Sequence, residues 1–345
     1  MANLFFLLSG ENETLPAAEL RAIMEAEGFS YKIRENLDQL VRLSSDVKSV
    51  KAVNSRSAYT KICALELFSC KAKKDEISQA ADSTNFKSVL SKGQSFAVRV
   101  KRVKEYSKKS DTMDLERRLG RKILKTTEKT VVNLKRPNKT FLGVLTSKKL
   151  VFGLKMAEMK PKTFSERRPR KKPFFHPSAM PSKLARCMIN LAHAKSGDLV
   201  LDPFVGTGSV IIEAALIGCQ ILGLDVQRKM IQGCRRNLKH FNLKAEGLII
   251  ADSRKLPLQK IEQLVTDPPY GRSATTMKST TKQIVTAIFN SAYPILRKGQ
   301  RICIASPKTL NIARIGAESG YKHLDSHFAY VHGTLTREIA IFERA

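Results

Sequence analysis

The sequence predicts an α/β protein: a Rossmann-like, mostly parallel sheet that ends in an antiparallel hairpin, preceded by an α+β N-terminal region. Three observations support this fold class. From residue 198 onward the order strand, turn, helix recurs, which is typical of a doubly wound sheet. Before it, period-two alternation and a basic amphipathic helix indicate a mixed α+β region. At 345 residues and 42% apolar content, the chain is large enough for more than one core.

The charge balance predicts a polyanionic partner. The chain holds 61 Lys and Arg against 31 Asp and Glu, a net charge of +30. Residues 51–172 alone carry 33 basic and 11 acidic side chains. A positive field of this size favours nucleic acid over a small acidic substrate, with a merely solvated basic surface as the alternative.

Membrane, secretory and metal classes are not indicated. No stretch reaches the roughly 18 consecutive apolar residues of a membrane span, and the apolar run 4–8 is too short for a signal peptide. The six cysteines form no Cys-x-x-Cys pair, so neither a disulfide framework nor a zinc cluster is predicted. We therefore expect a cytoplasmic protein with reduced cysteines, no metal site and no membrane contact.

Residues 1–85 predict a small α+β domain of ferredoxin-like type. Its expected elements are a strand at 4–8, a helix at 15–27 closed by Gly28, strands at 38–43 and 57–65, and a helix at 75–81.

Residues 86–154 predict a second domain with a basic face. Phe96, Val98 and Val100 alternate with basic residues, which predicts a half-buried strand. A helix follows at 114–124, and strands follow at 131–134 and 140–146. The predicted RNA-binding residues are Arg99, Lys101, Arg102, Arg117, Arg118, Lys122, Lys125, Lys135, Arg136 and Lys139.

Three stretches of this second region resemble a THUMP domain, the RNA-binding module of several tRNA-modifying enzymes. They are SFAVRVKR (95–102), DLERRLGRKI (114–123) and VNLKRPNKTFLGVL (132–145). The resemblance implies that residues 86–154 hold the acceptor end of tRNA.

Residues 155–172 predict a linker, because prolines interrupt a strongly basic segment. Two readings remain open. The segment is either a solvated tether or a strap that also touches the RNA.

The turn after the strand at 198–201 predicts a ligand-binding loop. Glycines at 206 and 208 let the backbone approach a ligand where the first parallel strand ends. Ile211 replaces the third glycine of a dinucleotide fingerprint, and no Gly-Lys-Ser/Thr follows to make a P-loop. The predicted cofactor-binding residues of this loop are Asp202, Pro203, Phe204, Gly206, Thr207 and Gly208.

Two further acids follow the next two strands. Asp225, with Val226, ends the strand at 220–224 and is placed to accept hydrogen bonds from ribose hydroxyls. Asp252, with Ser253, follows the strand at 247–250 and can reach an adenine amino group. Each acid alone could instead cap the following helix. Together they predict a pocket for adenosine with a short charged tail, and S-adenosylmethionine fits it better than a dinucleotide does.

The sequence Thr-Asp-Pro-Pro-Tyr at 266–270 predicts the catalytic loop. The prolines fix the backbone, so the Asp267 carboxylate and the Pro268 carbonyl can both accept from one exocyclic amine. Such acceptors orient the nitrogen lone pair toward an electrophilic methyl group. Tyr270 offers a flat face for base stacking. The catalytic prediction is Asp267, Pro268, Pro269 and Tyr270, with a strand-capping Pro-Pro turn as the alternative.

Residues 173–345 resemble a class I S-adenosylmethionine-dependent methyltransferase of the amino-modifying kind. LDPFVGTGSVIIEAA (201–215) resembles the cofactor loop, and TDPPYGRS (266–273) the catalytic motif. FFHPSAMPSKLARCMINLA (174–192) resembles the preceding segment that lines the methionine end of the pocket, with His176 as a candidate. The resemblance implies a seven-stranded sheet.

With the THUMP-like region, the whole chain resembles the archaeal-type tRNA guanosine-10 N2-methyltransferase family. The resemblance implies methylation of N2 of a tRNA guanosine, at position 10, once or twice. It also implies a monomer, or a complex with a small zinc-binding activator protein. RNA recognition and catalysis would then lie in separate parts of the chain. Residues 173–345 alone would fold and bind cofactor.

Other functions remain open. A related enzyme would methylate another tRNA or rRNA guanosine. DNA adenine and protein glutamine methyltransferases share the Pro-Pro-Tyr motif but do not explain the THUMP-like region. A protein of a different class would bind RNA without catalysis, which the presence of all four acids, Asp202, Asp225, Asp252 and Asp267, disfavours.

Overall fold

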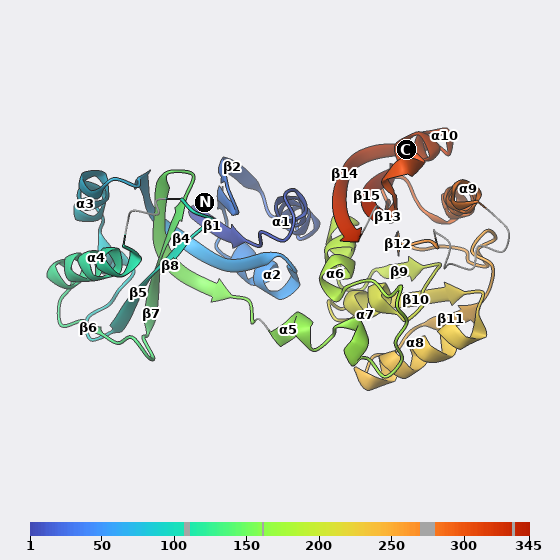
Figure 1. Ribbon diagram of the computed structural model, residues 1–345, viewed down its shortest axis with the longest axis horizontal. Coiled ribbons are helices and arrows are strands. Elements are labelled where there is room, and N and C mark those ends of the chain that lie inside the picture. The colour runs from blue at the N-terminus through green and yellow to red at the C-terminus, as the bar shows by residue number, and fades with distance from the viewer. Residues whose placement is uncertain (107–110, 161, 270–279, 333–334) are drawn as a thin grey trace. The chain divides into compact units, whose positions relative to one another are not determined.

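The computed structural model describes residues 1–106, 111–160, 162–269, 280–332 and 335–345. The chain forms two compact units (Figure 1). The first unit comprises residues 1–11, 29–54 and 60–159; the second comprises residues 12–28, 55–59 and 160–345. Two N-terminal segments are therefore part of the C-terminal unit. In the described part of the chain, no helix is both long and apolar enough to span a membrane.

The first unit is built on an eight-stranded sheet of order β2-β3-β1-β4-β8-β7-β5-β6. Neighbouring strands are antiparallel from β2 to β7, whereas β5 pairs in parallel with both β7 and β6. The strands are β1 (Ala2–Leu8), β2 (Tyr31–Leu37), β3 (Leu40–Ser45), β4 (Thr60–Lys71), β5 (Ser95–Arg102), β6 (Val131–Val132), β7 (Lys139–Thr146) and β8 (Lys149–Glu158).

Helices α3 (Lys74–Asp82) and α4 (Thr112–Thr126) belong to this unit, and α2 (Ser49–Arg56) begins in it. Leu115, Leu119 and Ile123 of α4 are buried at the predicted spacing and join the phenylalanine-rich core over β5, β7 and β8. The sequence missed β2, α2 and β8. One sheet runs through both ranges 1–85 and 86–154, so their division into two domains stays a prediction.

The predicted linker is largely ordered. Strand β8 continues to Glu158, and α5 (Lys162–Ser165) and a 3-10 turn at Pro169–Lys171 follow. Lys172 is buried and its Nζ donates to Ser209 Oγ at 3.0 Å. Arg167 and Lys172 are bound within the second unit, whereas Arg168, Arg170 and Lys171 are exposed. The segment is therefore not solvated throughout, and its role as a tether or as a strap on the RNA stays a prediction.

The second unit contains the predicted seven-stranded sheet, of order β11-β10-β9-β12-β13-β15-β14. All neighbours are parallel except at β15, which is antiparallel to β13 and β14. The strands are β9 (Leu199–Asp202), β10 (Gln220–Asp225), β11 (Gly247–Ile250), β12 (Gln263–Thr266), β13 (Arg301–Pro307), β14 (Tyr321–His332) and β15 (Leu335–Arg344). The predicted fold class is confirmed.

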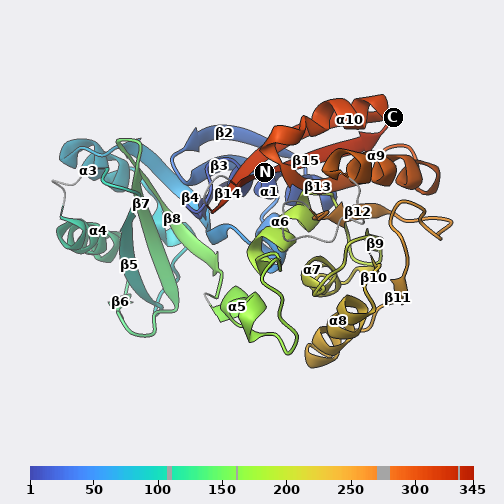
Figure 2. The same cartoon turned by 45° about the vertical axis from the view of Figure 1, so that its right-hand side comes forward.

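Helices cover both faces of this sheet (Figures 1 and 2). On one face lie α6 (Ser182–Leu191), α7 (Ser209–Ala215) and α8 (Arg228–His240), and on the other lie α9 (Thr281–Ala292) and α10 (Ile312–Glu318). The α9 and α10 side is packed by a continuous core that includes Leu264, Ile302 and Phe289. This two-sided burial explains why the parallel strands read as apolar runs.

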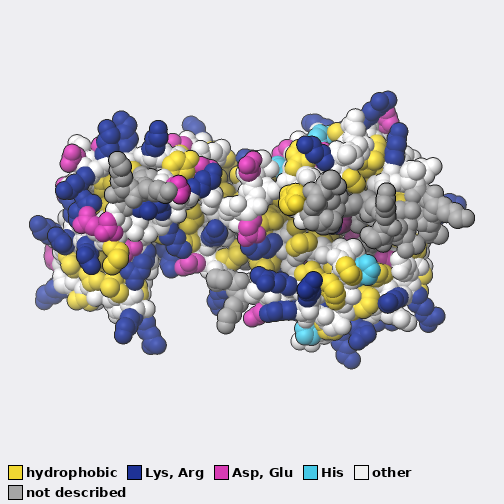
Figure 3. Space-filling model, viewed as in Figure 1, with side chains coloured by type: hydrophobic (Ala, Val, Ile, Leu, Met, Phe, Trp, Pro, Cys, Tyr) yellow, Lys and Arg dark blue, Asp and Glu magenta, His cyan; other side chains and the backbone are white. Residues whose placement is uncertain are grey.

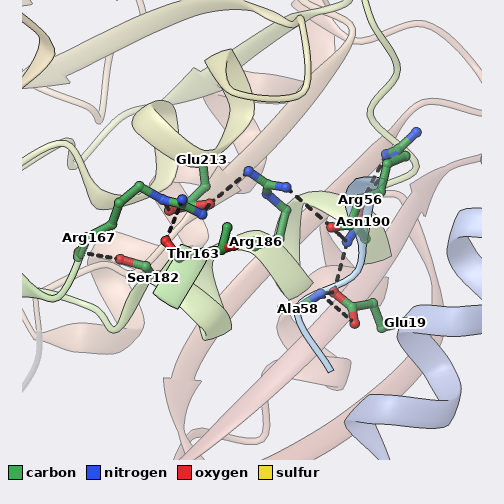
Figure 4. A network of polar contacts seen from close by, with 9 residues as sticks. All are labelled: Glu19, Arg56, Ala58, Thr163, Arg167, Ser182, Arg186, Asn190 and Glu213. Carbon is green, nitrogen blue, oxygen red and sulfur yellow. Dashed lines mark hydrogen bonds and ion pairs between the residues drawn. The ribbon is translucent and has the colours of Figure 1, made fainter. Parts of the chain in front are cut away.

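Helix α1 (Leu15–Ala26) packs in the second unit through a buried polar network (Figure 4). Asn190 of α6 donates to Glu19 Oε1 at 2.8 Å and accepts from Arg56 Nη2 at 3.1 Å. Glu19 also accepts from the backbone N–H groups of Ala58 and Tyr59, each at 2.9 Å. Burial raises the pKa of the Glu19 carboxyl.

The network continues to the helix that follows the glycine loop (Figure 4). Arg186 of α6 donates to the Arg56 carbonyl and pairs with Glu213 of α7 at 2.9 Å. Arg167, from the predicted linker, binds the same carboxylate at 2.7 Å. A fragment of residues 173–345 would lack α1, Arg56 and Arg167, so we no longer expect it to fold as well as the whole unit does.

Asn190→Ala should lower the free energy of unfolding by about 3 kcal/mol, because it leaves Glu19 and Arg56 buried with fewer partners. Asn54→Ala, at an exposed position of α2, is the control and should change it by less than about 0.5 kcal/mol. Urea unfolding of the full chain measures both. Equal effects would show that the network does not hold α1 in place.

Candidate active site

The acids predicted from the sequence meet at the carboxyl edge of the second sheet. Asp202 ends β9, Asp225 ends β10, and Asp267 directly follows β12. These three strands are neighbours and run parallel, so their carboxyl ends lie at one edge. In doubly wound sheets this edge is where ligands bind.

The glycine loop folds around the Asp225 carboxylate. Its Oδ2 accepts from Gly206 N at 3.1 Å and its Oδ1 from Gln227 N at 2.9 Å. Gly208 has φ of 82°, and a Cβ there would lie 2.7 Å from Cys234 Sγ. Only glycine suits that position. Burial raises the pKa of Asp225.

Asp202 is buried at this edge of the sheet, and its side chain connects two loops through hydrogen bonds. Its Oδ1 accepts from Thr266 Oγ1 at 2.7 Å and from Phe204 N at 3.1 Å. Burial raises the pKa of Asp202 to about 7, and the charges of Asp267 and Asp225 contribute in the same direction. Part of the rise in the pKa of Asp202 therefore comes from two other carboxylates at the same edge.

Asp267 is held by a residue that sequence reasoning missed. Arg337 Nη2 of β15 lies 2.9 Å from Asp267 Oδ2, and the two side chains are 10% and 15% exposed. Arg337 shares its face of β15 with the buried Ile339 and Ile341, by the period-two rule. Arg337 is a cation on the face of β15 that otherwise carries apolar residues. That pattern in the sequence could have identified Arg337 as a functional residue.

Two other residues of the catalytic prediction, Pro268 and Pro269, follow β12 directly. Pro268 is buried and Pro269 is half-buried after β12. Tyr270 lies outside the described residues, so its stacking role stays a prediction.

Asp252 and His176 make local contacts. Both oxygens of Asp252 accept from Arg254, with Nη2 to Oδ2 at 2.6 Å, and this interaction lowers the pKa of Asp252. His176 Nδ1 lies 2.7 Å from Ser178 Oγ. Ser253 is buried, and its carbonyl accepts from Ser291 Oγ at 3.2 Å. No described contact joins them to Asp202 or Asp267, so their cofactor roles stay predictions, as does that of Val226.

The segment before the cofactor loop is fastened to that loop. Asn237 of α8 donates to the carbonyls of Phe174 and Thr207, each at 2.9 Å, and accepts from Phe174 N at 2.9 Å. Lys172 binds Ser209 at the start of α7, and burial lowers its pKa to about 8. Sequence reasoning missed Asn237 and Lys172, since neither belongs to a recognisable motif.

The residues present fit S-adenosylmethionine. Asp225 is an acceptor at the place where an adenosine ribose binds in this fold. The acidic edge suits a sulfonium cation, because a nearby positive charge stabilises the ionised form of Asp202. Among the described residues, no group of three or more His, Cys, Asp or Glu is arranged to hold a metal ion.

The basic residues predicted to bind RNA fall into three groups in the first unit. Four are engaged by carboxylates: Arg118 with Asp114, Lys122 with Asp82, Arg99 with Glu116, and Lys101 with Glu158. Four are exposed and have no ion pair with a described carboxylate: Arg117, Lys125, Lys135 and Arg136. Lys139 and Arg102 are half-buried on β7 and β5. Their contact with RNA stays a prediction.

Two family models match the chain. One, described as an RMKL-like methyltransferase domain, matches residues 169–337 and covers all four predicted acids. The other, described as DNA methylase, matches residues 33–235, which span both units and end before Asp267.

Known proteins match over nearly the whole chain. It is 33% identical over 339 residues to the tRNA (guanine(10)-N2)-dimethyltransferase of Methanothermobacter thermautotrophicus, covering 98% of each chain. The crystal structure of TrmN from Thermus thermophilus has a TM-score of 0.57 at 18% identity and covers 99% of this chain and 100% of its own. The protein SMU.472, solved in complex with SAH, has a TM-score of 0.56 at 14% identity and covers 100% and 98%. These two structures show the same fold.

The raised pKa of Asp202 predicts that the free energy of unfolding depends on pH. Its pKa rises from 3.8 to about 7 on folding, so the folded state binds the proton more tightly. The resulting stabilisation is fully present below about pH 4 and is lost as the pH rises through about 7. Asp202→Asn keeps the acceptor for Thr266 but cannot ionise. At pH 8 the free energy of unfolding of this variant should exceed that of wild type by a few kcal/mol, at about 1.4 kcal/mol per pKa unit. At pH 4 the variant should be no more stable than wild type.

Urea unfolding of both proteins at these two pH values tests this expectation. A difference in unfolding free energy that is the same at pH 4 and pH 8 would contradict it.

Proposed function

The chain belongs to the family of the tRNA (guanine(10)-N2)-dimethyltransferases, and on that premise we propose that it transfers methyl groups from S-adenosylmethionine to N2 of guanosine 10 in tRNA. The observation that carries the proposal is the match to a relative of that name, at 33% identity over 98% of both chains. The acidic edge around Asp202 and Asp267 supports it, because it offers acceptors to a cation and to an amine.

The glycine loop would hold the cofactor. Asp225 would accept from the ribose hydroxyls, and the backbone at Gly206 and Gly208 would allow close approach. When bound, the cofactor supplies a methyl group on a positively charged sulfur. The Asp202 carboxylate would favour that charge in the binding step, because a nearby cation stabilises its ionised form.

The loop after β12 would hold the target amine. The Asp267 carboxylate and the Pro268 carbonyl would accept the two N–H groups and free the nitrogen lone pair. Arg337 fixes the Asp267 carboxylate through its ion pair at 2.9 Å. The amine nitrogen would form the new N–C bond as the C–S bond of the donor breaks, with the electron pair of that bond going to sulfur. The nitrogen would lose one proton to solvent afterwards, so no separate base is needed before the transfer.

RNA recognition would come from the first unit. We propose that residues 86–154 act as a THUMP-type module, and its exposed cations such as Arg117, Lys125 and Arg136 support this role. We also propose that the enzyme adds two methyl groups. It would act in the cytoplasm, as a monomer or with a small zinc-binding activator protein.

The proposal is tested by treating unmodified tRNA with the full-length protein and cofactor and analysing the nucleosides by mass spectrometry. We expect N2-methylguanosine and N2,N2-dimethylguanosine, and neither product in a tRNA with adenosine at position 10. Asp267→Asn should abolish both products. A DNA duplex serves as a second substrate, since one family model is described as DNA methylase. Methylated adenine or cytosine in DNA, with none in tRNA, would overturn the proposal.

Arg337→Gln should lower kcat by about 10- to 100-fold, because the Asp267 carboxylate loses the ion pair that positions it. Arg337→Lys should recover part of the loss. In the Gln variant the acid limb of the pH–rate profile should move to higher pH, since a nearby cation no longer favours the carboxylate.

Arg314→Gln, which removes an exposed pair with Glu318 on α10, is the matched control and should leave kcat unchanged. A change in KM alone for Arg337→Gln would show that Arg337 serves substrate binding and not the positioning of Asp267.

A further inference from the structure

Helix α8 carries an unusual amount of positive charge. Its 13 residues include five Lys and Arg and no Asp or Glu. Arg228, Lys229, Arg235, Arg236 and Lys239 are all exposed, and together they define the α8 cationic face. In Figure 3 dark blue side chains lie over α8 along the lower edge of the second unit.

These cations do not serve the packing of the helix. The buried side of α8 is formed by Ile231, Cys234 and Leu238, with Asn237 bound to the backbone of Phe174 and Thr207. None of the five cations forms an ion pair with a carboxylate in the described part of the chain. By contrast, Arg118 and Lys122 of α4 are paired with Asp114 and Asp82.

Several of these charges oppose helix stability, although Lys239, in the last turn, suits the negative end of the helix dipole. Arg228 and Lys229 occupy the first turn, which has no acidic residue. The helix macrodipole is positive at that end, so cations are unfavourable there. Arg235 and Lys239 are like charges four residues apart, which also repel. These cations have no acidic partner in the helix, although several of them destabilise it. We therefore expect a binding partner to supply the negative charge.

The shape of the surface fits an extended polyanion. Lys229, Arg236 and Lys239 follow one stripe along the helix and span about 15 Å at 1.5 Å per residue. A groove of about 480 Å³ runs beside them and is lined by Phe174. Charges spread along an open groove contact successive phosphates, whereas a single small anion requires donors that converge on one point.

Neighbouring cations extend this surface. Arg168, Arg170 and Lys171 are exposed just before Phe174, whose ring packs against Gly233 of α8. A second groove, of about 510 Å³, reaches Lys244 beyond the C-terminal end of the helix. The surface is therefore longer than α8 itself.

We propose that the α8 cationic face binds the phosphate backbone of the tRNA, as a second RNA-binding surface within the methyltransferase unit. This inference rests on the proposed function for the identity of the RNA. It assigns the second unit a share of substrate affinity that the sequence placed in the first unit. Because the contacts are to phosphates, they contribute affinity and salt dependence without reading base sequence.

The test compares two triple variants of the full-length protein that remove equal charge. Lys229→Gln/Arg236→Gln/Lys239→Gln changes the α8 cationic face. Lys282→Gln/Arg297→Gln/Lys298→Gln changes exposed positions elsewhere in the same unit. The dissociation constant for tRNA is measured by filter binding across a salt series, and the constant for cofactor by titration calorimetry.

The α8 triple variant should bind tRNA about tenfold more weakly near 0.1 M salt. Its log–log salt slope should be shallower by up to about two units, at roughly 0.7 to 0.9 per phosphate contact. Its cofactor dissociation constant should change less than twofold, and its melting temperature should not fall. Lys229→Arg/Lys239→Arg retains the charge and should bind as wild type.

The inference is overturned if the two triple variants have equal affinity and slope, or if affinity falls without any change of slope. Wild-type methyl transfer to guanosine 10 is measured in parallel. If wild type transfers methyl groups to guanosine 10 but the two triple variants bind tRNA equally well, the role of the α8 cationic face is refuted and the proposed function is not. Weaker, shallower binding of the α8 variant with no transfer by wild type would refute the proposed function and leave the surface standing.

Discussion

The hydrogen bond from Thr266 Oγ1 to Asp202 Oδ1, at 2.7 Å, joins the two loops on which the site depends. Asp202 begins the glycine loop, and Thr266 immediately precedes Asp267. Their strands, β9 and β12, are parallel neighbours, so the two loops leave the sheet side by side. The loop that we propose to hold the cofactor and the loop that we propose to hold the amine thus share one buried contact, which fixes their relative positions.

Acidic and basic side chains gather in different parts of this protein. A net charge of +30 is spread over its surfaces, yet the carboxyl edge of the second sheet gathers Asp202, Asp225 and Asp267. Burial makes Asp202 and Asp225 costly to ionise, and Arg337 forms an ion pair with Asp267. A cationic methyl donor and a neutral amine suit such an edge, whereas a polyanionic RNA suits the α8 cationic face that we propose to bind it.

The sequence predicted those parts of the site that are local in the chain. Glycines 206 and 208 and the acids 202, 225 and 267 each follow a strand, so the fold class places them at one edge. Arg337, Lys172 and Asn237 were not predicted, because each reaches its partner through tertiary packing across 30 or more residues. The same holds for α1, whose apolar stripe indicated a buried helix without showing that α6 covers it.

The account's central claim is that the 2-amino group of guanosine 10 receives the methyl group. The most direct measurement is transfer of labelled methyl to two tRNAs that differ only at position 10, one with guanosine and the other with inosine, which lacks that amine. The account predicts incorporation of label into the guanosine tRNA and none into the inosine tRNA, with similar dissociation constants for both. Equal incorporation into the two tRNAs would contradict it.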